Sequence, residues 1–326
     1  MYKNILFFSI LIILTSCKDN NKYTQLSGTA FGTYLSIQYQ DNLNRDFNKS
    51  VDSIVRKVNK SLSTYDKTSD ISRINQGYKN VKVDEKFIEV YNKSKRIFNE
   101  TNGVFDPTIG VLVNAWDFGP EKKIKNLDSV IVKSLMKQVG FNKVHLQNNL
   151  IIKENSKIYF DFNAIAKGYG IDVIGRFLES KNIKNYKVEI GGEVRVKGKN
   201  SSNNNWRIGI EHPNFDGSQS IQKIIELKNE SIATSGTYRK FKTDKNGNKY
   251  AHILNTKTGY PAKSNILSAS VIAPLDCADV DGYATTLIAF GLKNSKEFLK
   301  NHQELKAFII YVDNNGKMQT YQTESF

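Results

Sequence analysis

The chain has 326 residues, of which 39% are hydrophobic and 11% aromatic, and its formal net charge at pH 7 is +15. This length and composition can bury a sizeable core, which excludes a disordered or fibrous protein. The basic residues are lysines scattered over polar positions, with no stripe of Lys or Arg interleaved with aromatic residues. We therefore expect no nucleic-acid partner, while the charge is compatible with an anionic substrate or anionic lipid headgroups.

The first residues have the pattern of an export signal. Lys3 precedes an apolar run over 5–14, which is too short to span a bilayer as a mature helix. The sequence LTSC that follows resembles a bacterial lipobox, where cleavage leaves the cysteine, here Cys17, to receive a lipid. The alternative is an ordinary signal peptide with an incidental cysteine. We predict a lipoprotein signal peptide over 1–16, then the lipidated Cys17 and a polar tether over 17–26.

Once Cys17 carries a lipid, Cys277 is the only thiol that remains. No intrachain disulfide can then form, even in an oxidising compartment. We expect Cys277 to be a small buried hydrophobe rather than a reactive thiol.

Hydrophobic periodicity predicts alternating strands and helices. Thr33, Leu35, Ile37 and Tyr39 alternate with polar positions, which indicates a strand with one buried face. An apolar stripe with helical spacing follows over 45–62. Further helices are predicted over 85–101, 107–116, 128–138, 164–181, 280–290 and 294–303.

Short β-like runs lie between these helices. In chain order they are KVHLQ (143–147), LIIKE (150–154), KIYFDF (157–162), YKVEI (186–190), EVRVKG (193–198), WRIGIEH (206–212), IIELK (224–228), AHILN (251–255), ILSASVIA (266–273) and AFIIYVD (307–313). Turn pairs such as Asn148-Asn149, Asn246-Gly247 and Asn314-Asn315 separate several of them. The pattern predicts an α+β fold with a largely antiparallel sheet and packed helices, and no repeat or long linker after residue 26 divides it.

The segment DFNAIAKGYGIDVIGRFLES, 161–180, leads from an apolar run through small residues into a helix. Lys167 and Gly168 are therefore expected at a helix N-terminus, where free N–H groups and the helix dipole favour anions. The spacing matches neither a Walker motif nor a dinucleotide GxGxxG. A tight turn with a surface lysine is the alternative.

The segment VEIGGEVRVKGKN, 188–200, has Gly191-Gly192 between two β-like runs. The glycines indicate a tight bend or a close approach to another group, and a plain hairpin explains them equally well.

Hydroxyl and basic side chains gather over 231–261. Thr234, Ser235, Tyr238, Arg239 and His252 fall within about 20 residues in this region. A histidine in a β-like run is more often structural than catalytic. The strand–GxSxG–helix elbow of serine hydrolases is missing from the sequence.

The acidic stretch DCADVDGYATTLIAFG, 276–291, precedes an apolar helical run. Asp281 and Thr285 are four residues apart and so share one helix face. A carboxylate and a hydroxyl on one face offer oxygen ligands to a small divalent cation, and magnesium prefers such ligands. The alternative is that Asp279 and Asp281 only cap the helix. Zinc and copper are disfavoured because no histidine or cysteine ligand set accompanies these acids.

Taken together in chain order, these segments resemble the motif series of the ApbE family, which are FAD:protein FMN transferases and often periplasm-facing bacterial lipoproteins. The segments are SGTAFGTYLSI (27–37), LSTYDKTSDISRIN (62–75), NGVFDPTIGVLVNAWDFG (102–119), DFNAIAKGYGID (161–172), IGGEVRVKG (190–198), IATSGTYRKF (232–241), HILNTKTGYP (252–261) and DVDGYATTLIAFG (279–291). An ordered series is far more specific than any one motif. The resemblance implies a single T-fold-related flavin transferase domain over 27–326.

The resemblance also implies the chemistry of the site. FAD is the donor, Mg²⁺ binds its pyrophosphate, and FMN moves to a Ser or Thr hydroxyl of a target protein with release of AMP. By position, the metal is held by the side chains of Asp281 and Thr285 and by the carbonyl of Ala164. His252 matches the family histidine implicated in transfer. The flavin nucleotide contacts Phe31, Tyr65, Val104, Phe105, Asp106, Asp161, Lys167, His252 and Ile253.

The chain departs from the family pattern at a few positions. Phe31 stands where Met is usual, Thr237 where an acidic or amide residue is common, and Asn255-Thr256 where Asp-Pro is common. The positions that match the metal ligands are intact.

The resemblance leaves two alternatives to the transferase. One is a pyrophosphatase that splits FAD into FMN and AMP, and the other is a non-catalytic flavin-binding lipoprotein. For the transferase, the expected acceptor is a subunit of a membrane redox complex. The expected location is a bacterial membrane, with the protein lipid-anchored and facing the periplasm.

Overall fold

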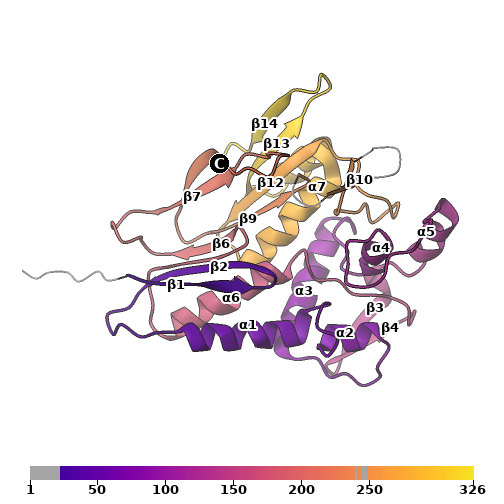
Figure 1. Ribbon diagram of the computed structural model, residues 1–326, viewed down its shortest axis with the longest axis horizontal. Helices are drawn as coiled ribbons and strands as arrows, with labels where there is room; N and C mark the ends of the chain where they lie inside the picture. The colour runs from indigo at the N-terminus through magenta and orange to yellow at the C-terminus, as the bar shows by residue number, and fades with distance from the viewer. Residues whose placement is uncertain (1–22, 239–240, 244–248) are drawn as a thin grey trace, which may run out of the picture.

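The structure is a computed structural model that describes residues 23–238, 241–243 and 249–326 (Figure 1). The predicted signal peptide, Cys17 and Arg239 lie outside the described residues, as does the predicted turn at Asn246-Gly247.

Eight strands form one antiparallel sheet in the order β1-β2-β5-β6-β9-β12-β13-β14. Their bounds are β1 Tyr23–Ala30, β2 Thr33–Gln40, β5 Tyr186–Ile190, β6 Glu193–Lys197, β9 Ser231–Gly236, β12 Ile266–Ala273, β13 Lys306–Val312 and β14 Met318–Gln322. Three separate antiparallel pairs are β3 Val144–Gln147 with β4 Leu150–Lys153, β7 Trp206–Glu211 with β8 Ile221–Leu227, and β10 Phe241–Thr243 with β11 Lys249–Ala251. The predicted α+β class with a largely antiparallel sheet is confirmed.

The helices are α1 Asn48–Leu62, α2 Asp70–Asn75, α3 Glu85–Glu100, α4 Gly110–Ala115, α5 Ser129–Met136, α6 Ala166–Ser180 and α7 Cys277–Lys300, with a 3₁₀ turn at Phe141–Lys143. Among the described residues no helix has the length and apolar character needed to cross a membrane.

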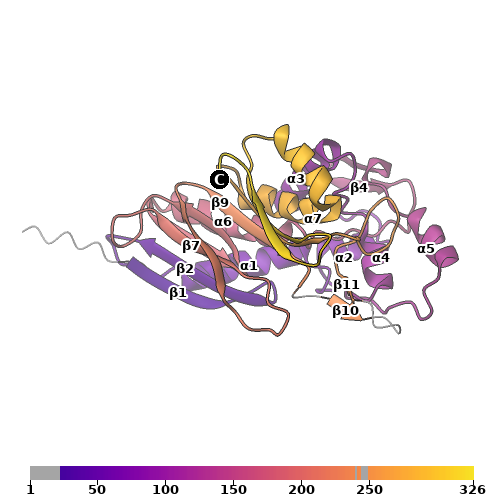
Figure 2. The ribbon, with the colours of Figure 1, turned by 90° about the horizontal axis from the view of Figure 1, so that it is seen from above.

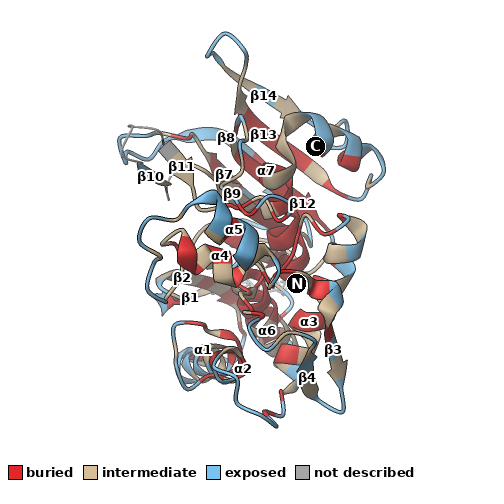
Figure 3. Cartoon of the chain, turned by 90° about the vertical axis from the view of Figure 1, so that its right-hand side faces the viewer, coloured by how far each residue is buried: buried red, intermediate tan, exposed pale blue. Residues whose placement is uncertain are grey.

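The sheet separates two apolar layers. Helices α1, α6 and α7 cover one face, and the β7–β8 hairpin covers part of the other (Figures 1 and 2). In β5, Tyr186, Val188 and Ile190 alternate with half-exposed residues and face the helices. In β12 both faces are covered, with Val271 in the helix layer and Ile272 in the hairpin layer. Figure 3 shows the buried positions concentrated in these central elements, while α5 is largely exposed.

Most predicted elements are confirmed at or near their predicted bounds, although α1, α4, α5 and α6 are shorter. Two predicted strands are wrong. The run at 157–162 makes only an isolated bridge at Tyr159. The run at 251–255 contains the last residue of β11, Ala251, and beyond it only an isolated bridge between Leu254 and Pro261. The two helices predicted over 280–303 form one element with a kink at Gly291, where φ is +72°.

The predicted tether extends too far into the chain. Residues 23–26 belong to β1, where Leu26 is buried and Tyr23 packs edge-on against Trp206 at 6.1 Å between ring centroids. The predicted domain start at residue 27 therefore lies inside a strand of the main sheet, and the folded part begins at least as early as Tyr23.

Cys277 is completely buried at the start of α7, as the sequence predicted. Burial raises the pKa of its thiol, which keeps it protonated and unreactive.

Candidate active site

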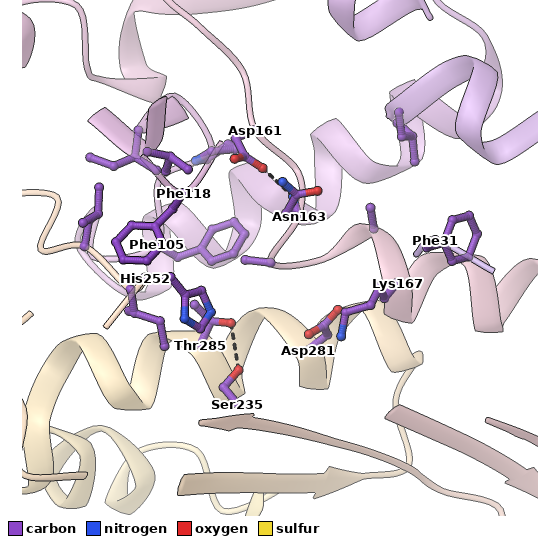
Figure 4. Close-up of a pocket in the computed structure, with 18 of the residues that line it drawn as sticks. Phe31, Phe105, Phe118, Asp161, Asn163, Lys167, Ser235, His252, Asp281 and Thr285 are labelled. Atoms are coloured by element: carbon purple, nitrogen blue, oxygen red, sulfur yellow. Dashed lines mark hydrogen bonds between the residues drawn. The ribbon is translucent and has the colours of Figure 1, made fainter. Parts of the chain in front are cut away.

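One cavity of about 1000 Å³ lies between the helix layer and the loops that follow β1, α3 and β11. Every predicted flavin and metal residue lines it: Phe31, Tyr65, Val104, Phe105, Asp106, Asp161, Ala164, Lys167, His252, Ile253, Asp281 and Thr285. The fold therefore brings together residues that are up to 254 positions apart in the chain, from Phe31 to Thr285. Figure 4 shows Lys167, Asp281, Thr285 and His252 on neighbouring walls of this cavity.

Asp281 lies on the cavity-facing side of α7. Its Oδ2 accepts a hydrogen bond of 3.1 Å from the N–H of Gly168, in the first turn of α6. Gly168 is required because a Cβ there would lie 2.4 Å from the carbonyl oxygen of Cys277. Burial raises the pKa of Asp281 to about 8, although Lys167 and the Gly168 N–H act to lower it.

Thr285 lies one helical turn after Asp281, as the spacing predicted. Its hydroxyl is 2.9 Å from that of Ser235 on β9, and the two share a hydrogen bond (Figure 4). Thr234 also lines the cavity and bonds to Ser270 at 2.8 Å. The hydroxyl cluster predicted over 231–261 thus reaches the site through β9, while Tyr238 is buried and does not line the cavity.

Lys167 is in the first turn of α6, as predicted, but it is not the surface lysine of the alternative interpretation. Its ammonium forms an ion pair with the carboxylate of Glu193, the first residue of β6. Burial lowers the pKa of Lys167, but the nearby charges of Glu193 and Asp281 outweigh this effect and raise it overall. Gly191 and Gly192 form the tight turn between β5 and β6, with φ of +63° and +108°, and so place Glu193 on the cavity wall.

Sequence reasoning missed Glu193 as a site residue. The run EVRVKG fitted a strand, and an acid at its first position gave no separate signal beyond its place after the two glycines.

Phe31 occupies a backbone conformation that favours glycine. It has a φ of +51° in the two-residue turn that joins β1 to β2, which is costly for a bulky side chain. Its ring lies directly over Gly170 of α6, where a Cβ would come within 2.2 Å of Phe31 Cε2. The turn and the glycine together hold this ring at the cavity wall.

Asp106 lines the cavity, but its carboxylate also holds the local chain together. One oxygen accepts hydrogen bonds from the N–H and the hydroxyl of Thr108, at 2.8 and 2.6 Å, and the other accepts from the N–H of Phe141 at 3.2 Å. Burial raises the pKa of Asp106. Asp161 similarly accepts a bond of 2.7 Å from the N–H of Asn163 just before α6 (Figure 4).

His252 follows β11 directly. Its ring meets that of Phe118 edge-on, with 6.2 Å between centroids, and both rings are labelled in Figure 4. An imidazole in this position borders the side of the cavity where Asp281 and Thr285 offer their oxygens.

The oxygen donors of the cavity fit a small divalent cation. Asp281 and Thr285 offer a carboxylate and a hydroxyl, and Ala164, which also lines the cavity, has a backbone carbonyl that could serve as a third ligand. Burial raises the pKa of the Asp281 carboxyl, and a positive charge beside it would favour its ionised form. A bound cation would supply that charge. Within the described part of the chain, no group of three or more His, Cys, Asp or Glu forms a metal cluster.

An ion network supports α7 behind the cavity. Asp276 contacts Lys93, Arg176 and Arg195 at 2.9, 2.6 and 2.5 Å. Lys93 also pairs with Asp279 at 3.0 Å. These contacts tie α3, α6 and β6 to the start of α7.

The interpretation of Asp279 and Asp281 as simple helix caps is wrong. The N–H groups of Cys277 and Ala278 are capped by Asp172 of α6, which accepts them at 2.8 and 2.9 Å. Sequence reasoning missed Asp172 because a single acid within an apolar helix gives no pattern of its own. Asp279 forms ion pairs, and Asp281 faces the cavity.

Comparison with known proteins identifies a consistent set of relatives. The model of the ApbE family matches residues 31–309. A FAD:protein FMN transferase of Haemophilus influenzae is 33% identical over 327 residues, which cover 96% of this chain and 94% of that protein. The solved structure of flavin transferase ApbE from Vibrio cholerae superposes with a TM-score of 0.83 at 33% identity, covering 94% of this chain and 98% of that one. The ApbE protein of Thermotoga maritima superposes with a TM-score of 0.82 at 26% identity, covering 94% and 98%.

Proposed function

Because the chain belongs to the ApbE family, we propose that it transfers FMN from FAD to a Ser or Thr hydroxyl of a target protein in a Mg²⁺-dependent reaction. The relatives named FAD:protein FMN transferase cover nearly the whole chain, which supports flavin transfer as the activity. The observation that carries the proposal is the single cavity lined by all twelve predicted flavin and metal residues.

The transfer breaks the phosphoanhydride bond of the FAD diphosphate and forms a phosphate ester bond to the acceptor oxygen. The acceptor hydroxyl attacks the phosphorus on the flavin side of the FAD diphosphate, and the bond from that phosphorus to the bridging oxygen breaks. AMP leaves with the bridging oxygen, and the hydroxyl proton goes to a base. Because negative charge builds on the phosphoryl oxygens, the reaction needs positive charge that is already in place.

Two features of the chain supply or organise that positive charge. Lys167 presents an ammonium to the cavity from the first turn of α6, where the helix dipole also favours anions. Asp281, Thr285 and the carbonyl of Ala164 would hold the cation. A bound Mg²⁺ would polarise the phosphoryl oxygens and neutralise charge on the departing phosphate.

His252 is the proposed base. An imidazole can accept a proton near neutral pH, and this one borders the same cavity as the cation ligands. Phe31 and Tyr65 supply apolar surface that suits a flavin or adenine ring, and the edge-on contact with Phe118 orients the histidine ring.

We further propose that Cys17 carries a lipid, that the protein faces the periplasm, and that the acceptor belongs to a membrane redox complex. The support is the lipobox-like sequence before Cys17 together with the family membership.

The first experiment incubates the purified chain with FAD, Mg²⁺ and a membrane extract from its host. Mass spectrometry then searches for FMN on Ser or Thr, and chromatography measures AMP. A labelled protein that disappears when EDTA is added is the expected result. AMP without a label would indicate the pyrophosphatase instead, and FAD binding without either product would indicate the flavin-binding lipoprotein.

A further inference from the structure

One carboxylate oxygen of Glu193 is buried without a hydrogen-bond partner among the described residues. Its side chain is only 5% exposed and lines the cavity. Oε1 pairs with the ammonium of Lys167, whereas Oε2 is buried and has no hydrogen-bond partner among the described residues. A buried carboxylate oxygen without a partner is costly, so its presence at the cavity wall calls for a role.

Lys167 lies between two carboxylates and pairs with one of them. The charges of both Glu193 and Asp281 act on its ammonium. The ion pair that forms is with Glu193, and no ion pair joins Lys167 to Asp281, although both side chains are described and lie side by side in Figure 4. Among the described residues, Asp281 instead accepts only the backbone N–H of Gly168.

We propose that Glu193 is a positioning residue that keeps Lys167 from pairing with Asp281, and so leaves the Asp281 carboxylate available to a divalent cation. This inference deepens the proposed function and rests on it only in taking Asp281 as a cation ligand.

The charge count of the cavity wall supports this role. Two carboxylates and one ammonium, when all are ionised, give a net charge of −1, which attracts a divalent cation. Without the charge of Glu193, Lys167 and Asp281 would neutralise each other, because opposite charges this close in a low dielectric attract strongly. The ammonium would then compete for the same oxygens as the cation. With Glu193 present, Lys167 stays in the cavity and can still meet an anionic diphosphate.

The test measures Mg²⁺ binding without FAD, by calorimetry and by the rise in melting temperature on addition of Mg²⁺. The Glu193→Gln variant keeps the size of the side chain but removes its charge. We expect its dissociation constant for Mg²⁺ to rise on the order of tenfold or more. The double variant Glu193→Gln with Lys167→Met removes the competing ammonium as well, and we expect its Mg²⁺ affinity to return close to that of the unmodified protein.

Glu230 provides a matched control. It forms a partly buried pair with Lys306 at 2.5 Å, with its own side chain 11% exposed, but lies outside the site. The Glu230→Gln variant should leave Mg²⁺ affinity unchanged. A loss of Mg²⁺ affinity in Glu193→Gln that the double variant fails to reverse would show a purely structural role and overturn the proposal. Unchanged affinity in Glu193→Gln would overturn it too.

The proposed function is judged separately, by FMN transfer in the presence and absence of EDTA. If Asp281→Ala still bound Mg²⁺ as tightly as the unmodified protein, the cation would lie elsewhere and the role given to Glu193 would be wrong. A labelled acceptor protein would still establish flavin transfer in that case.

Discussion

Asp281 and His252 line the same cavity but differ in what their surroundings allow. Asp281 is buried, bonded to a backbone N–H and short of positive charge, which suits it to bind a cation. His252 follows a short strand and lines the same cavity as Thr285, which suits it to exchange a proton with a substrate. Substitutions at the two positions should therefore separate metal binding from proton transfer.

The Asp281→Asn variant should lose FMN transfer by at least about a hundredfold, because the amide cannot replace the charge of a metal ligand. Its fold should persist, since an amide oxygen can still accept the Gly168 N–H. Transfer rate and circular dichroism are the measurements, with Asp216→Asn on an exposed loop as the control. Transfer at the normal rate would rule out Asp281 as a ligand.

The His252→Ala variant should bind FAD with nearly unchanged affinity but transfer FMN at least about a hundredfold more slowly, because the proton acceptor is lost. Titration of flavin fluorescence gives the affinity, and single-turnover formation of AMP gives the rate. A variant that transferred normally would show that another group, or water, takes the proton.

At the scale of elements, the contact between α6 and α7 determines the geometry of the site. The two helices approach so closely at Gly168 that its N–H reaches Asp281. Asp172, one turn further along α6, caps the start of α7. The ion network around Asp276 adds α3 and β6 to the same junction. The proposed cation ligands Asp281 and Thr285 and the nearby Lys167 therefore lie where α6 and α7 are packed tightly together.

The Gly168→Ala variant should lower the free energy of unfolding by about 2 kcal/mol or more, because its Cβ would be 2.4 Å from the backbone of Cys277. It should also weaken Mg²⁺ binding, since the helices must separate. Gly28→Ala is the control: no atom lies within 4 Å of the added Cβ, and the change should be within about 0.5 kcal/mol. Chemical denaturation measures the free energy of unfolding of both variants. Equal stability of the two variants would contradict the argument.

The wrong strand prediction at 157–162 has a physical cause. Ile158, Phe160 and Phe162 are buried and alternate with more exposed residues, which is the pattern of a strand. The rings of Phe160 and Phe162 instead pack in an aromatic cluster with Phe87 and Phe141. An extended chain that lies over a core has the same period as a strand in a sheet. Pairing depends on a neighbouring strand that the local sequence does not specify.

The strand and the site residues that the sequence analysis missed have little apolar pattern of their own. β1 is an edge strand with only Leu26 and Ala30 buried, so its residues read as a polar tether. Glu193 and Asp172 acquire their roles from Lys167 and the start of α7, which are distant in sequence. Periodicity identifies buried faces, but it cannot identify the partner of a buried charge.

At the scale of the whole molecule, the motif series was more informative than the local patterns. The family, the fold class and the flavin transferase activity predicted from it are confirmed by the relatives, and the predicted site residues meet in one cavity. The order of the motifs carries information about tertiary contacts that no single motif contains. The metal, the acceptor and the location stay as proposals.

The cavity also borders a small third core, apart from the two layers beside the sheet, and this core should respond to ligand. Leu112, Val132, Val139 and Leu254 form this core under α4 and α5, apart from the main core beside the sheet. Leu254 also lines the cavity. A small core opens at lower free energy than a large one, so hydrogen exchange in this region should be comparatively fast.

Addition of FAD and Mg²⁺ should slow hydrogen exchange over 109–136 by about tenfold or more, while β13 and β14 change little. Mass spectrometry of peptides from the exchanged protein measures both regions in one experiment. Uniform slowing of all peptides would indicate global stabilisation instead, and no slowing over 109–136 would show that this core is not coupled to the cavity.

The length and direction of β1 set the distance between the start of the described chain and the cavity. The strand begins at Tyr23, at the left of Figure 1, and its last residue, Ala30, leads directly to Phe31 at the cavity. Eight residues of strand span about 26 Å. If Cys17 carries the proposed lipid, β1 acts as a spacer between the anchored end and the cavity. Such a spacer would favour acceptors whose modified residue stands clear of the membrane.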